Sequence, residues 1–219
     1  MIDIKETLLT NHNRPGKKIR NLKGIVIHWT ANTSKGANAV ANRNYFNTTE
    51  RAASAHYIVD DKNIIRCVPD EEIAYHVGAN AYTKIGNSIH EKINGVRYSP
   101  NYFLIGIEMC VNSDGNWAMT YQNTVQLAAF LLKKHNLTID DMYRHYDITG
   151  KDCPKMMIAQ KEWDLFKNRV KAYMEMDEVS DWARDAWRWV KEKGISDGAR
   201  PKDNITREEV WTMLYRLMG

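Results

Sequence analysis

Apolar and polar residues follow two different periods along the first three quarters of the chain. Two segments, 24–30 and 104–111, are short apolar runs rich in β-branched residues and are predicted buried strands. Residues 56–68 predict a β-hairpin that turns at Asp61–Asn63. Three others repeat apolar residues every three or four positions and are predicted amphipathic helices: 34–46, 120–136 and 161–174. Residues 142–147 predict a short strand or its exit loop, while 78–99 have no regular period and predict long loops. This alternation predicts an α/β domain with a central mixed β-sheet flanked by helices.

The pattern changes near residues 174–180, which predicts two domains, 1–174 and 178–219. Four of the seven tryptophans lie after this point: Trp182, Trp187, Trp189 and Trp211. The tail predicts two short helices, one after Ser180 as N-cap and stopping at Gly194, the other after a Thr206–Glu209 capping box. Two apolar stripes of this size are too small to form a core by themselves, so the tail is expected to need a partner.

Composition is that of a globular protein. The 219 residues are 43% hydrophobic and 26% charged, with a formal net charge of +4. No apolar run is long enough to cross a bilayer, and no basic-aromatic stripe indicates nucleic-acid binding. The N-terminal segment has no apolar signal region, so synthesis in the cytoplasm is expected.

The three cysteines, Cys67, Cys110 and Cys153, are too few for a disulfide framework and are more typical of buried residues, catalytic thiols or metal ligands.

Two histidines and a cysteine are candidate metal ligands. His28 ends a predicted buried strand, His145 lies at another strand end, and Cys153 follows eight residues later. Zinc binds imidazole nitrogen and thiolate sulfur, and a catalytic zinc keeps three protein ligands with one open position. Gly150 lets the intervening chain fold back so that both side chains reach one ion. The alternative for each residue taken alone is simple burial in the core.

Two charged residues accompany this set. Glu108 interrupts an otherwise apolar strand, where a carboxylate is costly unless it is paired or functional. Next to an activated water it could act as general base, and the alternative is a salt bridge at the strand end. Lys151 lies two residues before Cys153, where a cation could stabilise an oxyanion; the alternative is a solvated loop lysine.

Four motifs in order resemble one known family. They are IVIHWT at 25–30, SAHYIVDDKNIIRCVPDEEIAYHVG at 54–78, NYFLIGIEMC at 101–110 and RHYDITGKDCP at 144–154. Together they resemble the zinc-dependent N-acetylmuramoyl-L-alanine amidases, which include phage endolysins and bacterial autolysins, over about residues 20–173.

The resemblance implies a role for each candidate residue. It implies that His28, His145 and Cys153 bind Zn²⁺. It implies that Glu108 is the catalytic glutamate and that Lys151 is the lysine two residues before the last ligand. It also implies that His76 and Asn101 line the substrate groove and contact substrate. His56 is expected either to have a structural role or to support a neighbouring site residue.

The tail resembles a single S-layer homology module. The resemblance rests on WARDAWRWVKEKGISDG at 182–198 and ITREEVWTMLYRLMG at 205–219. It implies that the C-terminal module binds a cell-wall polymer or associates with a second copy of the chain to form a homo-oligomer.

The implied function is hydrolysis of the amide bond between N-acetylmuramic acid and L-alanine in peptidoglycan. A chain without a signal and with a wall-binding tail suggests a phage or prophage endolysin that is released at lysis and acts on a Gram-positive wall. Three alternatives stay open: a bacterial autolysin, a non-catalytic peptidoglycan-binding protein of the same fold, and an amidase in which Cys153 is the nucleophile.

Overall fold

A computed structural model describes residues 2–199 and 201–218. The chain divides into two compact units, Met1–Val170 and Lys171–Gly219. The division falls within the helix α5 (Gln160–Glu178), slightly before the boundary expected from the sequence. No helix in the described ranges combines the length and the apolar character needed to span a membrane.

The first unit is built on a six-stranded sheet with the strand order β1-β4-β3-β7-β2-β8. Its strands are β1 (Lys5–Glu6), β2 (Gly24–Trp29), β3 (Tyr57–Val59), β4 (Ile64–Arg66), β7 (Leu104–Met109) and β8 (Met142–Arg144). Neighbouring strands are parallel except in the β3–β4 hairpin, which is antiparallel. The predicted central mixed sheet is therefore confirmed.

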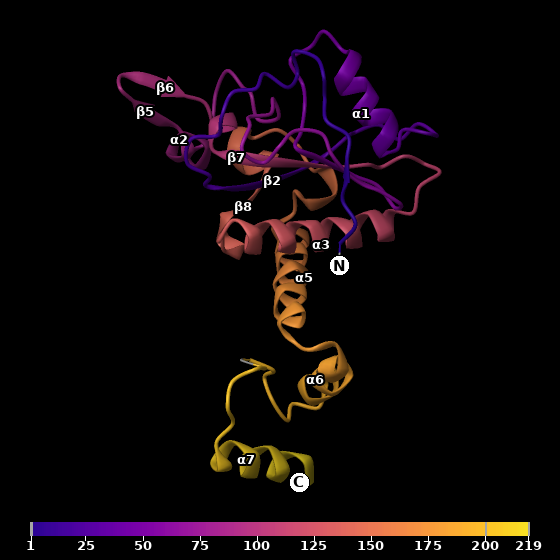
Figure 1. Cartoon of the computed structure of the whole chain (residues 1–219), viewed down its shortest axis with the longest axis vertical. Coiled ribbons are helices and arrows are strands. Elements are labelled where there is room, and N and C mark those ends of the chain that lie inside the picture. Colours follow the sequence, from indigo (N-terminus) through magenta and orange to yellow (C-terminus); the bar gives the residue numbers. More distant parts are fainter. Residues whose placement is uncertain (1, 200, 219) are drawn as a thin grey trace. The chain divides into compact units, whose positions relative to one another are not determined.

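Helices cover both faces of this sheet (Figure 1). The helix α3 (Trp117–Lys134) packs on one face, against β2, β3 and β7. The other face is covered by α1 (Ala39–Thr48), α2 (Lys84–Ile89) and α4 (His145–Thr149). Side chains alternate along a strand, so Ile25 and Ile107 face α3, whereas Val26 and Leu104 pack with α2 and α4.

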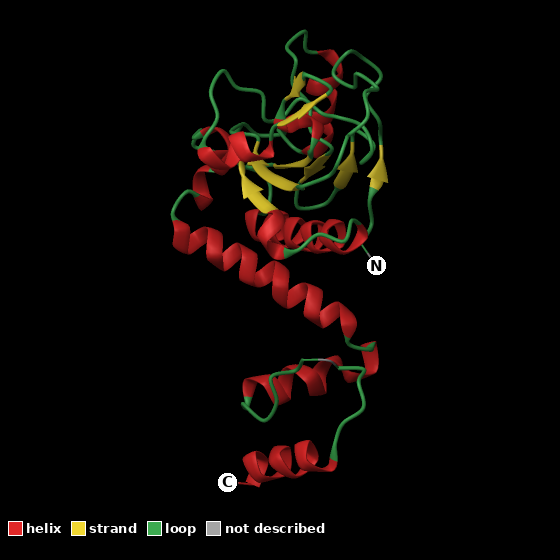
Figure 2. Ribbon diagram, turned by 90° about the vertical axis from the view of Figure 1, so that its left-hand side faces the viewer, coloured by secondary structure: helices red, strands yellow, loops and turns green. Residues whose placement is uncertain are grey.

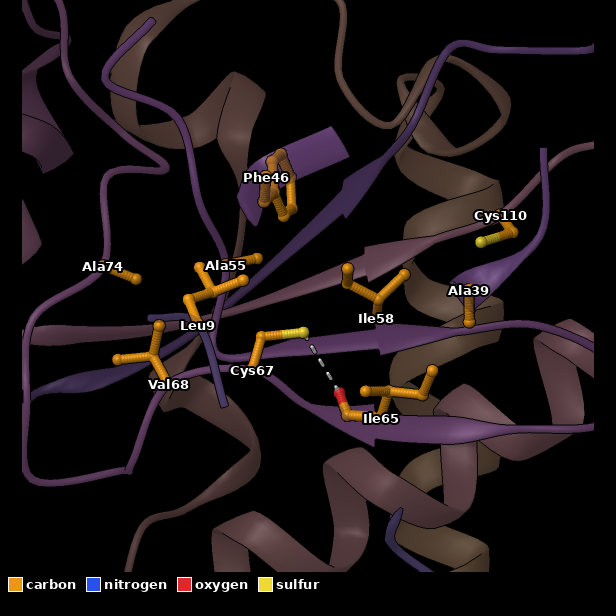
Figure 3. Packing of buried hydrophobic residues seen from close by; sticks show 10 residues of the cluster. All are labelled: Leu9, Ala39, Phe46, Ala55, Ile58, Ile65, Cys67, Val68, Ala74 and Cys110. Atoms are coloured by element: carbon orange, nitrogen blue, oxygen red, sulfur yellow. Dashed lines mark hydrogen bonds between the residues drawn. The ribbon is translucent and has the colours of Figure 1, made fainter. Parts of the chain in front are cut away.

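Two of the three cysteines belong to the core of this unit. Cys67 and Cys110 are buried in one hydrophobic cluster with Ile58 and Phe46 (Figure 3). The Cys67 thiol donates a weak hydrogen bond to the backbone oxygen of Ile65, 3.8 Å away, and burial raises its pKa to about 12. Both thiols are free and serve as small apolar side chains.

The expectation of long loops at 78–99 is wrong. This segment contains α2 and a hairpin of β5 (Glu91–Ile93) and β6 (Val96–Tyr98). Its turn is Asn94–Gly95, and both residues have positive φ, as a tight hairpin turn requires. Neither strand is buried, so the hairpin lacks the apolar alternation by which a strand is predicted.

Helix α1 also differs from its prediction, because it begins at Ala39 instead of residue 34. The Asn38 side chain accepts a hydrogen bond from the Ala41 N–H and so caps the helix at this point. Four single 3₁₀ turns complete the described elements: Pro100–Tyr102, Ile139–Asp141, Lys155–Met157 and Asp181–Ala183.

The second unit consists of helices joined by loops (Figure 2). They are α6 (Arg184–Glu192) and α7 (Arg207–Met218), which follow the end of α5. The Thr206–Glu209 capping box is confirmed, because each residue's side chain bonds to the other's backbone N–H. Gly194, at φ 67°, follows α6 as predicted. The Ser180 prediction is wrong, since its hydroxyl makes no capping bond and a 3₁₀ turn precedes α6.

Candidate active site

Parallel strands that end at the same edge bring three candidate residues together. His28 on β2 is the register partner of Glu108 on β7, so the two side chains leave the sheet on the same face. On the other side of β2, Ile27 pairs with Arg144, the last residue of β8. His145 follows directly and begins α4 beside His28. This position, beyond the carboxyl ends of the strands, is where α/β sheets commonly bind ligands.

A tight loop returns the chain from His145 to Cys153. Gly150 ends α4 in the left-handed conformation, at φ 79°, as the sequence predicts for a chain that folds back. The Tyr146 N–H then donates to the backbone oxygen of Cys153 at 2.9 Å, which closes the loop. The eight-residue spacing thus places both side chains at one point.

Arg144 fixes this loop, and its role was missed from the sequence. Its guanidinium forms an ion pair with Asp147 at 2.6 Å and donates to the backbone oxygens of Met157 and Ile158 at 3.0 and 2.9 Å. It therefore ties both ends of the segment that contains the two candidate ligands. The R-x-x-D spacing in RHYD, which puts both charges on one side of a helical turn, is the signal that could have found it.

The three candidate ligands converge. His28 Nδ1 lies 3.1 Å from His145 Nδ1 and 3.7 Å from Cys153 Sγ, and all three residues are buried. With Zn–N bonds of about 2.0–2.1 Å and Zn–S bonds of about 2.3 Å, tetrahedral geometry needs separations of roughly 3.4 and 3.6 Å. Two imidazole nitrogens and one sulfur at these distances fit a catalytic zinc site.

The electrostatics of the rings suit a metal ligand. Burial lowers the pKa of His28 well below its ordinary value and, with the nearby charge of Lys151, lowers that of His145 to about 4. Both rings are therefore neutral and offer a lone pair. Burial also raises the pKa of the Cys153 thiol to about 12, so without a cation the sulfur holds its proton.

Glu108 has the properties of a general base. Its Oε2 is buried and has no hydrogen-bond partner in the described part of the chain. Burial raises its pKa from 4.5 to about 7, although the charge of Lys151 acts in the opposite direction. A carboxylate that is desolvated and unpartnered takes up a proton readily at neutral pH.

One cavity of about 400 Å³ joins these groups. It is lined by all seven residues singled out from the sequence, including the exposed Lys151. The sequence analysis did not identify four other residues that line the cavity, because no pattern distinguishes them from ordinary surface positions. They are Trp29, Phe46, Arg51 and Tyr75.

His76 and Asn101 line the cavity, but their polar atoms bond within the protein. The Asn101 side-chain oxygen accepts from the N–H groups of His76 and Val77 at 3.2 and 3.0 Å. His76 Nδ1 is 3.0 Å from His28 Nε2, and His76 Nε2 is 3.2 Å from the backbone oxygen of Leu104. Substrate contact by either residue stays a prediction.

His56 is buried on the same face of the sheet. Its Nδ1 accepts from the Gly106 N–H at 3.0 Å, and its Nε2 donates to the backbone oxygen of Glu72 at 2.8 Å. Both nitrogens bond to backbone, which agrees with the structural role expected for this residue.

Known proteins match most of this chain. The family model described as N-acetylmuramoyl-L-alanine amidase matches residues 18–156. The amidase BlyA of Bacillus subtilis (strain 168) is 38% identical over 175 residues, which are 78% of this chain and 47% of BlyA. The chain spans about half the length of the first curated relatives it matches.

Solved structures agree with this match. The catalytic domain of XlyA is 31% identical with a TM-score of 0.65, and the match covers 77% of this chain and 99% of that domain. A mutant endolysin from Bacillus subtilis is 32% identical with the same TM-score, over 78% and 99%. The family model covers more than half of the chain, and the chain belongs to the N-acetylmuramoyl-L-alanine amidase family.

Proposed function

We propose that the first unit is a zinc-dependent amidase that cleaves peptidoglycan between N-acetylmuramic acid and L-alanine. The observation that carries the proposal is the convergence of His28, His145 and Cys153 in a cavity that Glu108, with its buried Oε2, also lines. The bond is the one that the description of the family and the name of BlyA state, the amide between N-acetylmuramic acid and L-alanine.

In this mechanism the chain supplies a metal site, a base and a cation. Zinc held by the two imidazoles and the thiolate would act as a Lewis acid on the substrate carbonyl and lower the pKa of water. Glu108 takes the proton of the attacking water and later delivers it to the amine of L-alanine as the C–N bond breaks. The ammonium of Lys151, at the same cavity, stabilises the oxyanion that forms on the carbonyl.

The electrostatics favour this mechanism over a cysteine nucleophile. A nucleophilic cysteine needs a lowered pKa, whereas burial raises the pKa of Cys153 to about 12. His28 lies 3.7 Å from the thiol, but its own pKa is lowered, so it is a weak base. A bound cation removes the difficulty, since coordination deprotonates a thiol.

A test of the proposed function is product analysis with a soluble muramyl peptide. Amidase activity yields a peptide with a free L-alanine amine and a sugar with an intact lactyl carboxylate, both visible by mass spectrometry. Cleavage of a glycosidic or peptide bond instead, or binding without cleavage, would contradict the proposal. The second result would support the non-catalytic alternative.

We further propose an endolysin role for the whole chain. This rests on the similarity to a mutant endolysin from Bacillus subtilis, which is 32% identical to this chain. Added from outside, the protein should lower the turbidity of purified Gram-positive walls. The alternative is an autolysin. Expression of the protein in growing cells without prophage induction would favour that alternative.

For the second unit we propose attachment to a cell-wall polymer. Its support is the S-layer-homology-like sequence and a cavity of about 420 Å³ lined by residues such as Ala186, Trp187 and Met213. A chain ending at residue 175 should cleave soluble muramyl peptides normally but sediment less with whole walls. Equal sedimentation of both chains would contradict wall attachment, and a full-length dimer beside a truncated monomer would identify self-association instead.

A further inference from the structure

A line of hydrogen bonds extends behind the candidate metal site. It runs from the backbone oxygen of Leu104 to His76 Nε2, at 3.2 Å, and from His76 Nδ1 to His28 Nε2, at 3.0 Å. The His28 ring stands edge-on to His76, with 5.1 Å between ring centroids and 87° between planes. The other ring nitrogen of His28 is the one that points to His145 and Cys153.

The direction of this line follows from its first member. A carbonyl oxygen only accepts hydrogen bonds, so His76 Nε2 must carry the hydrogen. In the neutral, buried ring the opposite nitrogen, Nδ1, is then bare and must accept from His28 Nε2. His28 therefore carries its hydrogen on Nε2, and its bare Nδ1 faces the point where the candidate ligands meet.

The surroundings of His76 hold its ring in this place. Gly106 lies directly beneath the ring, and a Cβ there would be 2.6 Å from Cγ of His76. The Gly106 N–H is itself bonded to His56, whose ring packs edge-on against His76. Asn101 holds the backbone of His76 and Val77 through its side-chain oxygen. Gly106 and His56 thus pack against the imidazole, while Asn101 holds the backbone that carries it.

We propose that His76 is a positioning residue that acts through His28. It selects the His28 tautomer with the hydrogen on Nε2 and orients the ring so that Nδ1 is available to zinc. The inference rests on the proposed zinc site and assigns His76 a task other than substrate contact. Partners that orient a ligating histidine in this way commonly account for 10- to 100-fold in metal affinity.

Two substitutions of matched shape separate the hydrogen bond from packing. Asparagine and leucine are nearly isosteric, but in His76→Asn the side-chain oxygen sits close to the former Nδ1 and still accepts from His28. His76→Leu fills similar space with no acceptor. Both variants lose the bond to Leu104, so they differ chiefly in the contact to His28.

Two readouts apply to the purified full-length chain. The first is the tautomer of His28, read from ¹H–¹⁵N correlations of the imidazole nitrogens, which needs no activity. The second is zinc affinity, measured by competition with a chromogenic chelator. Val77→Ala is the control for lost packing. Val77 is buried next to His76, and its side chain has no polar atom that could bond to a candidate ligand.

The expected result is a His28 hydrogen on Nε2 in wild type and His76→Asn. His76→Leu should lose this preference and weaken zinc binding about 10- to 100-fold, with His76→Asn weakened less. Val77→Ala should bind zinc as wild type does.

Equal zinc affinities for the Leu and Asn variants would overturn the inference, as would a wild-type His76 with its hydrogen on Nδ1. The wild-type tautomer decides the question even if His76→Leu does not fold. A wild-type chain that binds no zinc would instead overturn the proposed function.

Discussion

The two units of the chain differ in how deeply they bury their large apolar side chains. In the first unit Ile25, Ile105 and Ile107 are fully buried on the face of the sheet that α3 covers. In the second unit Trp182 is 89% exposed, Trp211 61% and Leu214 49%, although α6 and α7 have clear apolar stripes. The family match, 18–156, lies entirely within the first unit.

The difference shows what a catalytic site needs from its surroundings. Polar groups such as His28 and Glu108 lose hydration when they are buried, and a well-packed sheet with helices on both faces can tolerate that cost. A unit of about 50 residues has too little core to do the same. The first unit therefore contains the candidate chemistry, and the second presents apolar surface.

The largest effect expected within the first unit comes from its three candidate ligands. His28→Ala, His145→Ala or Cys153→Ala should abolish zinc binding and peptidoglycan hydrolysis, because each removes one of only three protein donors. Elemental analysis and a hydrolysis assay measure both. Cys110→Ala is the matched control. Cys110 is buried in the core cluster and is not a candidate ligand, so this variant should still bind zinc. Full activity in any ligand variant would break the assignment.

A smaller but still large effect is expected at Glu108. Glu108→Gln keeps the shape of the side chain but cannot take a proton at neutral pH, so kcat should fall by about 10²–10⁴-fold. Zinc content should not change. The same substitution at the exposed Glu50 provides the control. A near-normal rate in Glu108→Gln would mean that another group accepts the proton.

A pair of core substitutions sharpens the comparison of the two units. Ile107→Ala should destabilise the first unit by about 2–5 kcal/mol, as expected for a fully buried isoleucine. Leu214→Ala, at a half-exposed position, should change stability by no more than about 0.5 kcal/mol. Urea unfolding followed by tryptophan fluorescence measures both. Similar losses would show that α7 is covered in solution, which self-association would explain.

A further effect concerns the stability of the chelator-treated chain as a function of pH. The folded state raises the pKa of Glu108 from 4.5 to about 7, so the buried carboxylate costs stability above pH 7 and nothing below pH 4.5. Glu108→Gln removes that cost and should raise the melting temperature at pH 8 but not at pH 4. A stabilisation that is the same at both pH values would exclude ionisation as the cause.

The sequence predicted the parts of the site that depend on strand patterns and spacing. His28 and Glu108 stand in apolar strands, where a polar side chain is unusual, and the structure places them as register partners. The fold-back at Gly150 followed from the glycine itself. These features are local, so a single sequence reveals them.

Features that depend on contacts distant along the chain were not predicted. The bond between His76 and His28 joins residues 48 positions apart. Position 106 requires glycine because the ring of His76, on another segment, leaves no room for a Cβ. The hairpin at β5–β6 was missed for a different reason. Its strands are not buried and lack apolar alternation, so the turn residues Asn94–Gly95 were its only signal in the sequence.

The most direct test of the central claim is zinc content measured together with activity in one preparation of the wild-type chain. The account predicts one zinc per chain, loss of hydrolysis when a chelator removes it, and recovery in proportion to the zinc added back. The reason is that His28, His145 and Cys153 converge on one point. A preparation free of zinc that hydrolyses muramyl peptides at the full rate would contradict it.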